Sequence, residues 1–235
     1  MSGAGSTPGT RPLVIAVAGM DFEAELARRA GARAVFAANA ALLERNFEAA
    51  LGPGCSGILS FGTAGGLAQG LAPGDLVLAS AVDGPAGRVA ADEAWHTRLR
   101  TALIAGGLVV HDGIVASVNE PLVDVAGKAA LQARTGALVV DMESHRAAAW
   151  AARLGVPFAI CRVVVDPAWR SLPRAALAGL RDDGTTVVLP VLRELLRAPT
   201  QLGGLLRVAG DARAARATLT RVSEALARAG ALSLH

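Results

Sequence analysis

An alternation of short apolar runs and helix-like segments constrains the fold of this chain more than any other feature. The apolar runs are rich in valine, isoleucine and leucine, and each is short enough for a buried strand: LVIAVAG (13–19), ARAVFA (32–37), SGILSFG (56–62), DLVLASAV (75–82), ALVVDM (137–142) and PFAICRVVVD (157–166). Helices are expected between them, at 21–31, 39–52, 91–106, 123–136 and 143–155, and a further strand or hairpin at 107–118. Strands that alternate with helices are typical of α/β proteins, in which helices cover a central sheet.

The chain changes in character after Asp166. It holds no convincing strand there, and we expect residues 168–235 to form a helical extension of three or four helices. Breaks are expected near Pro190, Pro199 and Gly203–Gly204. Leucines recur at helical spacing in LPVLRELL (189–196) and QLGGLL (201–206). These helices are expected to cover the sheet, or alternatively to form an apolar wall for a greasy ligand or a membrane surface. Without a clear linker or repeat, residues 13–235 are expected to form one domain.

The composition excludes several classes of protein. With 52% hydrophobic and 18% charged residues, the chain is expected to fold rather than remain disordered. Its net charge is only +3, its arginines are spread along the chain and it has no tyrosine, so we expect no nucleic-acid partner. Cys55 and Cys161 lie far apart in apolar contexts and are expected to be free thiols. Because no Cys or His residues have metal-ligand spacing, we expect neither a structural metal nor a cofactor.

Residues 1–12, MSGAGSTPGTRP, are polar and rich in turn-forming residues, and we expect them to form a flexible tail. They lack the basic start and apolar core of a signal peptide. No run in the chain approaches the roughly 20 apolar residues of a membrane-spanning helix. A cytoplasmic protein is therefore expected.

Three acidic residues lie at or just past the predicted carboxyl ends of strands: Glu23, Glu143 and Asp166. In open α/β sheets the ligand crevice lies outside these strand ends, so three carboxylates from distant parts of the chain indicate a site. Each acid taken singly has another explanation, because a helix dipole stabilises acids in the first turn. The glycine-rich stretch GTAGGLAQGLAPG (62–74) permits close backbone approach. It is expected to form a binding loop, or alternatively a tight crossing between strands.

The motifs FGTAGGL, PGDLV, VVDMES and FAICRVVVD, in this order, resemble those of the nucleoside phosphorylase and nucleosidase superfamily, which includes methylthioadenosine/S-adenosylhomocysteine nucleosidases. The resemblance covers about residues 12–168 and implies a three-layer α/β/α fold with a mixed central sheet, and a homodimer. Within the superfamily, VDMESHRAAAWAARLGVPFAICRVVVDPA and the later DDGTT look like the hopanoid-associated branch. That branch implies removal of adenine from adenosylhopane, an adenosylated hopanoid lipid, to give a ribosylated hopane. With such a substrate, a peripheral contact with the inner membrane surface is expected.

The resemblance also implies roles for individual residues. Asp166 matches the aspartate that delivers a proton toward N7 of the departing purine, which requires burial or hydrogen bonding to keep it protonated above its usual pKa of ~3.9. Glu143 matches the glutamate that accepts hydrogen bonds from the ribose 2′- and 3′-hydroxyls, and Met142 beside it packs on the ribose. Glu23 matches the acid that activates the attacking water, with Asp21 as a weaker candidate.

The same resemblance places four residues near the nucleophile and the base: Thr63, Ala64, Gly65 and Gly66. Related nucleosidases place an aromatic side chain over the purine, whereas the segment GIVASVNEPL (113–122) has none. The residues expected to take its place are Ser117, Val118 and Asn119. His145 is expected to pack behind the site, with a hydrogen bond to the ribose or a strand end as the alternative. Arg162 is expected to pair with a buried acid, because unpaired burial of a charge is costly.

Water is favoured over phosphate as the nucleophile. Phosphorylases of this superfamily hold phosphate with arginines. One of these arginines typically lies two residues before the glycine of the GT motif, and Ser60 occupies that position in this chain. Glu23 near the nucleophile would also repel phosphate. Three alternatives stay open: phosphorolysis with an arginine from elsewhere, a general methylthioadenosine/S-adenosylhomocysteine nucleosidase, and a non-catalytic lipid or nucleoside carrier. A hopanoid tail further predicts an apolar channel, walled by the helices after Asp166.

Overall fold

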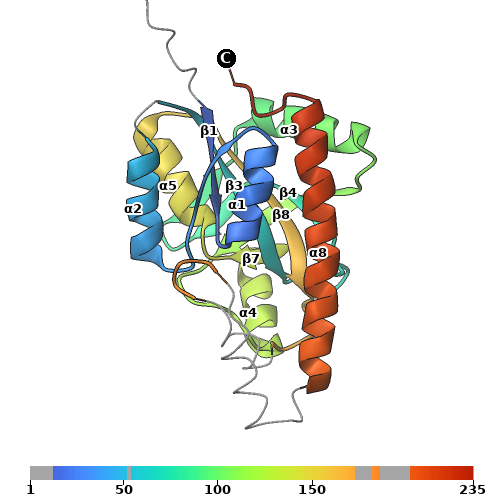
Figure 1. Ribbon diagram of the computed structural model, residues 1–235. Helices are drawn as coiled ribbons and strands as arrows, with labels where there is room; N and C mark the ends of the chain where they lie inside the picture. The colour runs from blue at the N-terminus through green and yellow to red at the C-terminus, as the bar shows by residue number, and fades with distance from the viewer. Residues whose placement is uncertain (1–12, 52–53, 173–180, 186–201, 235) are drawn as a thin grey trace, which may run out of the picture.

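The computed structural model describes residues 13–51, 54–172, 181–185 and 202–234. These residues form a mixed sheet with helices on both faces, which confirms the predicted three-layer α/β/α fold (Figure 1). The strands are β1 (Leu13–Ala18), β2 (Arg33–Phe36), β3 (Cys55–Gly66), β4 (Leu76–Gly84), β5 (Gly87–Ala90), β6 (Val110–Ser117), β7 (Val139–Asp141) and β8 (Phe158–Asp166). The helices are α1 (Asp21–Arg29), α2 (Ala40–Ala50), α3 (Glu93–Ala105), α4 (Val125–Thr135), α5 (Ser144–Leu154) and α8 (Leu202–Arg228).

Strand β8 closes most of the sheet into a ring. The strand order is β2-β1-β3-β7-β6-β4-β5, and β8 pairs with both β3 and β4. It is parallel to β3 and antiparallel to β4, whereas β7 is antiparallel to β3 and parallel to β6. The strands β3, β7, β6, β4 and β8 therefore form a closed circuit, and β1 and β2 extend it on one side. Closure pairs strand edges that would otherwise be open.

Apolar layers separate the sheet from the helices on each face. On one face α1, α3 and α8 bury side chains such as Trp95 and Leu219 against the strands. On the other face α2 and α5 pack through Phe47 and Trp150, whose rings are stacked with centroids 3.9 Å apart. In Figure 1, α2 and α5 lie on one side of the strands and α1 and α8 on the other. Because both faces are covered, the central strands are continuously apolar rather than alternating.

The glycine-rich stretch is the main local correction to the predicted elements. Residues 62–66 were expected to form a loop, but they are the last part of β3. They stay extended because β8 pairs with β3 along one edge and β7 pairs with Gly65 and Gly66 on the other. Residues 110–117 form one strand, β6, and not a hairpin. The hairpin lies earlier, where the unexpected short strand β5 pairs with β4.

Helix α8 is 27 residues long and includes Gly203 and Gly204, so these glycines do not interrupt it, and the residues before Leu202 lie outside the described part of the chain. Both glycines lie in its first turn, and a buried stripe that includes Leu219, Val222 and Leu226 provides the packing that stabilises it. The other predicted breaks, near Pro190 and Pro199, lie outside the described residues, as do the leucines of 189–196 and the tail 1–12. None of the described helices is long and apolar enough to cross a membrane.

Both cysteines are free, as predicted. Cys161 lies in β8 and is buried, and burial raises the pKa of its thiol to about 12. It is therefore an unreactive packing residue rather than a nucleophile.

Candidate active site

The predicted site residues converge on one open cavity of about 200 Å³ at the carboxyl ends of β1, β3 and β8. The cavity is lined by Gly19, Met20, Glu23, Ala38, Thr63, Ala64, Gly65, Val118, Pro121, Leu122, Val140, Asp141, Met142, Glu143, Val165, Asp166 and Leu172. Of the residues predicted for the site, Gly66, Ser117 and Asn119 do not line the cavity, and neither does the weaker candidate Asp21. Gly66 instead pairs with Val139 of β7, and a Cβ there would lie 3.2 Å from the carbonyl oxygen of Asp166. It therefore packs behind the strand end.

Glu23, in the first turn of α1, turns its carboxylate back toward β3. Its Oε1 accepts hydrogen bonds from Thr63 N and Thr63 Oγ1, both at 2.7 Å, and its Oε2 accepts from Gly19 N and Met20 N, both at 3.1 Å. The contact with Met20, just before the helix, is the helix-end role considered for this acid, but the contacts with Thr63 tie it to the cavity wall. Burial raises the pKa of Glu23, although these donors and Arg162 oppose the rise.

Gly62 makes the position of Glu23 sterically feasible. Its φ is +145°, a backbone conformation that residues other than glycine rarely adopt, and a Cβ at this position would lie 2.6 Å from the Glu23 carboxyl. The glycine of the FGT motif therefore makes room for an acid 39 positions earlier in the chain, although Gly62 itself does not line the cavity.

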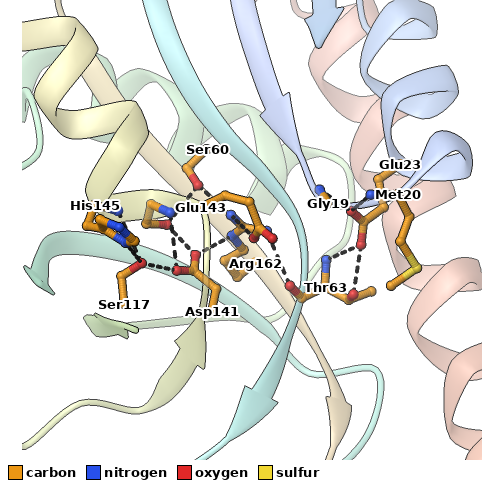
Figure 2. A network of polar contacts seen from close by, with 11 residues as sticks. Gly19, Met20, Glu23, Ser60, Thr63, Ser117, Asp141, Glu143, His145 and Arg162 are labelled. Carbon is orange, nitrogen blue, oxygen red and sulfur yellow. Dashed lines mark hydrogen bonds and ion pairs between the residues drawn. The ribbon is translucent and has the colours of Figure 1, made fainter. Parts of the chain in front are cut away.

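Arg162, on β8, is paired with two buried acids, which confirms the expectation that it has an acidic partner (Figure 2). Its Nε lies 2.8 Å from Asp141 Oδ2 in an ion pair without hydrogen-bond alignment, and its Nη2 lies 3.1 Å from Glu143 Oε2. Nη2 also donates to Ser60 Oγ at 2.6 Å, and Nη1 donates to the carbonyl oxygen of Thr63 at 3.2 Å. The guanidinium is 1% exposed and does not line the cavity. Its charge is therefore used to hold the acids and not to hold an anionic ligand.

The carboxyl of Glu143 lies among more negative than positive charge. Burial raises its pKa to about 7, with Asp141 and Glu23 adding to the rise and Arg162 opposing it. The side chain is 13% exposed and lines the cavity. Near neutral pH this carboxyl can therefore exchange a proton or accept hydrogen bonds from a bound diol.

Asp141, two residues before Glu143, has a structural role. It accepts hydrogen bonds from Ser117 Oγ at 2.6 Å, from Ser144 N at 3.2 Å and from Ser144 Oγ. The Nδ1 of His145 lies 2.8 Å from Ser117 Oγ (Figure 2). Since the Ser117 hydroxyl donates to Asp141, His145 must donate to Ser117, which makes this trio a structural tie between β6, β7 and α5 rather than an activated serine. Burial lowers the pKa of His145, so this tie involves a neutral imidazole.

Asp166 closes the other end of the cavity and is paired with a residue that sequence reasoning missed. Lys128, in the first turn of α4, is 0% exposed, and its Nζ contacts Asp166 Oδ2. Burial raises the pKa of Asp166, and the Lys128 ammonium opposes the rise. The available signal was composition, because Lys128 is the only lysine in an arginine-rich chain. Its partner lies 38 positions away, so no local motif connects the two.

The rest of the lining is apolar. Val118, Pro121 and Leu122 come from the segment after β6, and Leu172 from the segment after β8. Of the residues expected to replace a purine-stacking aromatic, only Val118 lines the cavity. Ser117 is bound to Asp141 and His145, and Asn119 Oδ1 accepts a hydrogen bond from Arg146 at 3.3 Å. No group of three or more potential metal ligands occurs among the residues that the structure describes.

A larger groove of about 1050 Å³ lies at the opposite end of the sheet, next to Leu13, Trp95 and Leu234. It has a single carboxylate in its lining, Asp92, and that side chain caps α3 by accepting a hydrogen bond from Trp95 N at 2.8 Å. The smaller cavity with its cluster of acids is therefore the better candidate for chemistry.

Comparison with solved structures identifies the same fold in nucleosidases. The 5′-methylthioadenosine/S-adenosylhomocysteine nucleosidase of Neisseria meningitidis, in complex with methylthio-immucillin-A, superposes with a TM-score of 0.61 at 20% identity, over 92% of this chain and 98% of that one. A mutant of the Helicobacter pylori nucleosidase with 5′-methylthioadenosine in its active site gives 0.65 at 13% identity, over 94% and 99%. A mutant futalosine hydrolase of Helicobacter pylori gives 0.59 at 15% identity, over 68% and 90%.

Sequence comparison with curated proteins gives no match. The family model of the phosphorylase superfamily, in contrast, matches residues 7–176, which include every predicted strand and all the acids of the cavity. The chain therefore belongs to the phosphorylase superfamily.

Proposed function

We propose that this protein hydrolyses the N-glycosidic bond of an adenosyl nucleoside and releases adenine. The observation that carries the proposal is the convergence of Glu23, Glu143 and Asp166 on one cavity, with each carboxyl held by different partners. Cleavage of an N-glycosidic bond needs an acid for the departing base and negative charge near the sugar cation that develops, as in glycoside hydrolysis. The solved structures with this fold include nucleosidases bound to methylthioadenosine or its analogues, which supports the same class of ligand.

Asp166 is proposed as the acid, because its pKa is raised and its Oδ1 accepts no hydrogen bond from the described residues. Glu143 is proposed to bind the ribose hydroxyls, with Met142 beside it in the cavity lining. Glu23 is proposed to activate water. All four of its hydrogen bonds are to protein donors, so a water can reach it only when the rotatable hydroxyl of Thr63 gives up its contact. Thr63 would then hold the water against Glu23.

Water is favoured over phosphate by the charge of the cavity. The described lining residues include no arginine, lysine or histidine, whereas they include four carboxylates. The nearest arginine, Arg162, is already paired with Asp141 and Glu143. Among the described residues of the lining, a phosphate ion would therefore meet carboxylates and no cation.

The finer part of the proposal is that the substrate is adenosylhopane. Its support is the resemblance of the motifs to the hopanoid-associated branch, together with the aliphatic lining contributed by Pro121, Leu122 and Leu172. A homodimer and a peripheral contact with a membrane surface belong to the same proposal. Sedimentation equilibrium tests the dimer, and flotation with lipid vesicles tests the membrane contact.

The deciding experiment measures adenine release from adenosylhopane, methylthioadenosine and S-adenosylhomocysteine, each with and without phosphate. The proposal expects release without phosphate and the highest kcat/KM for adenosylhopane. Release that requires phosphate would establish phosphorolysis. Equal or higher kcat/KM for the two smaller nucleosides would establish a general nucleosidase. Release from none of the three would contradict the enzymatic proposal and favour the carrier.

A further inference from the structure

Lys128 is the buried group that the proposed chemistry does not yet use. Its Nζ contacts three acceptors, all from the segment at the end of β8: Asp166 Oδ2, the carbonyl oxygen of Pro167 at 3.0 Å and the carbonyl oxygen of Arg170 at 3.0 Å. An ammonium has three N–H donors, whereas a neutral amine has two and a lone pair that would face an acceptor. The contacts therefore fit a charged ammonium whose donors are all used.

These contacts leave the two oxygens of Asp166 unequal. Oδ2 is bound to Lys128, whereas Oδ1 receives no hydrogen bond from any residue that the structure describes, and Asp166 lines the cavity. Both oxygens lie beside the glycine end of β3, with Oδ1 at 3.2 Å and Oδ2 at 3.5 Å from where a Cβ on Gly65 would be. One oxygen is therefore anchored, and the other is free to meet a ligand.

The charges around Asp166 come from its own segment and two helices. Lys128 of α4 contacts it directly. Arg170, four residues later, also favours its ionised form, but Arg170 is itself paired with Asp211 of α8, which opposes ionisation. Glu23 and Glu143 also line the cavity, and the charge of Arg162, which does not line it, favours the ionised form of both. Lys128 is thus the only cation in direct contact with Asp166 among the described residues.

We infer that Lys128 is a positioning residue that anchors Oδ2 of Asp166, directs Oδ1 toward the leaving base and stabilises the carboxylate left after proton transfer. The inference rests on the proposed function. In that step the O–H bond at Oδ1 breaks and an N–H bond forms at the base, while the electron pair of the N-glycosidic bond moves into the base. The water oxygen then bonds to the anomeric carbon, its proton passes to Glu23, and solvent restores the proton on Asp166. The ammonium keeps its protons throughout, so Lys128 acts through Asp166 and does not touch the substrate.

The test compares Lys128→Met, Lys128→Arg and the control Arg134→Met, which removes a positive charge from an exposed position of the same helix. For adenine release, kcat/KM of Lys128→Met should fall by on the order of 10²-fold. The basic limb of the plot of kcat/KM against pH should move to higher pH in Lys128→Met, because the Asp166 pKa rises when the ammonium is removed. Lys128→Arg should keep the limb near its wild-type position, and Arg134→Met should change neither quantity. In the Asp166→Asn background, Lys128→Met should cost less than about threefold, since the residue acts through Asp166.

A measurement without turnover separates this inference from the proposed function. The Asp166 carboxyl carbon, assigned by its loss in Asp166→Asn, is titrated by ¹³C NMR in wild type and in Lys128→Met, and its pKa should be higher in the variant. No increase would overturn the inference, whatever the activity. An increase in a protein that releases adenine from no adenosyl compound would instead overturn the proposed function. If Lys128→Met loses activity equally in the wild-type and Asp166→Asn backgrounds, its role is structural and the inference fails.

Discussion

Glu143→Gln should make the free energy of unfolding less sensitive to rising pH. The pKa of Glu143 is raised in the folded protein from 4.5 to about 7, chiefly by burial. Below pH 4.5 the carboxyl is protonated in both the folded and unfolded states, and its contribution to stability is fully present. As the pH rises through 7, the unfolded state ionises freely while the folded state resists ionisation, so the contribution is lost. At about 1.4 kcal/mol for each pH unit, the loss is about 3 kcal/mol.

Glutamine is neutral throughout this range, and it has nearly the same size and shape as glutamate. The free energy of unfolding of Glu143→Gln minus that of wild type should therefore become more positive by about 3 kcal/mol between pH 4.5 and pH 8. Urea unfolding at half-unit pH steps measures it, with Glu25→Gln, an exposed glutamate of α1, as the control for loss of a surface carboxylate. A difference between Glu143→Gln and wild type that stays constant within about 1 kcal/mol, or that falls with pH, would refute the placement of Glu143 in a buried, negatively charged environment.

The remaining predictions concern the other acids and the glycine beside them. Asp166→Asn should lower kcat for adenine release by about 10²–10⁴-fold while substrate Kd changes little; a variant with wild-type kcat would show that Asp166 is not the acid. Glu23→Gln should lower kcat and also destabilise the fold by about 1–3 kcal/mol. Both carboxylate oxygens accept hydrogen bonds from N–H groups, and the amide NH₂ of glutamine must face one of these groups. A variant that unfolds at the same temperature as wild type would contradict this. Gly62→Ala should destabilise by about 2–4 kcal/mol, since its φ is +145° and a Cβ would lie 2.6 Å from Glu23, whereas Gly70→Ala, with no atom within 4 Å, is the control and should change stability little.

The strand-end acids were predictable because the signal for each is local. A buried strand reads as a short apolar run, and an acid at its end falls at the carboxyl edge of the sheet by the geometry of the fold. Glu23, Glu143 and Asp166 follow three such runs, and the structure brings them to one cavity. The pairing of Arg162 was predictable for a different reason, since an arginine within a core strand requires a buried partner.

The features that sequence reasoning missed depend on contacts between distant segments. Gly62–Gly66 look like a loop in isolation, and they are extended because β7 and β8 pair with them. Lys128 looks like an ordinary helix residue, and its importance comes from the segment that follows β8. Gly66 carries the same motif signal as Gly65, but it lies against the backbone of Asp166 and Ala168 and does not line the cavity, which no local pattern indicates.

Strand β8 carries both Arg162 and Asp166 and holds them at different places along its length. Arg162 and Asp166 lie four residues apart on it, about 13 Å along an extended strand, which separates the cation that holds Glu143 from the acid proposed for the base. The register with β3 shifts between these two residues, so that Ala64 lies opposite Val164 and Gly65 lies opposite Asp166. Such an irregularity changes the direction of a side chain at the end of a strand. Because Gly65 has no Cβ, the carboxyl of Asp166 fits against β3, with Oδ1 3.2 Å from the place that a Cβ would take. Gly65→Ala should therefore displace the Asp166 carboxyl, and the need for glycine at position 65 comes from pairing with β8, which the local motif does not encode.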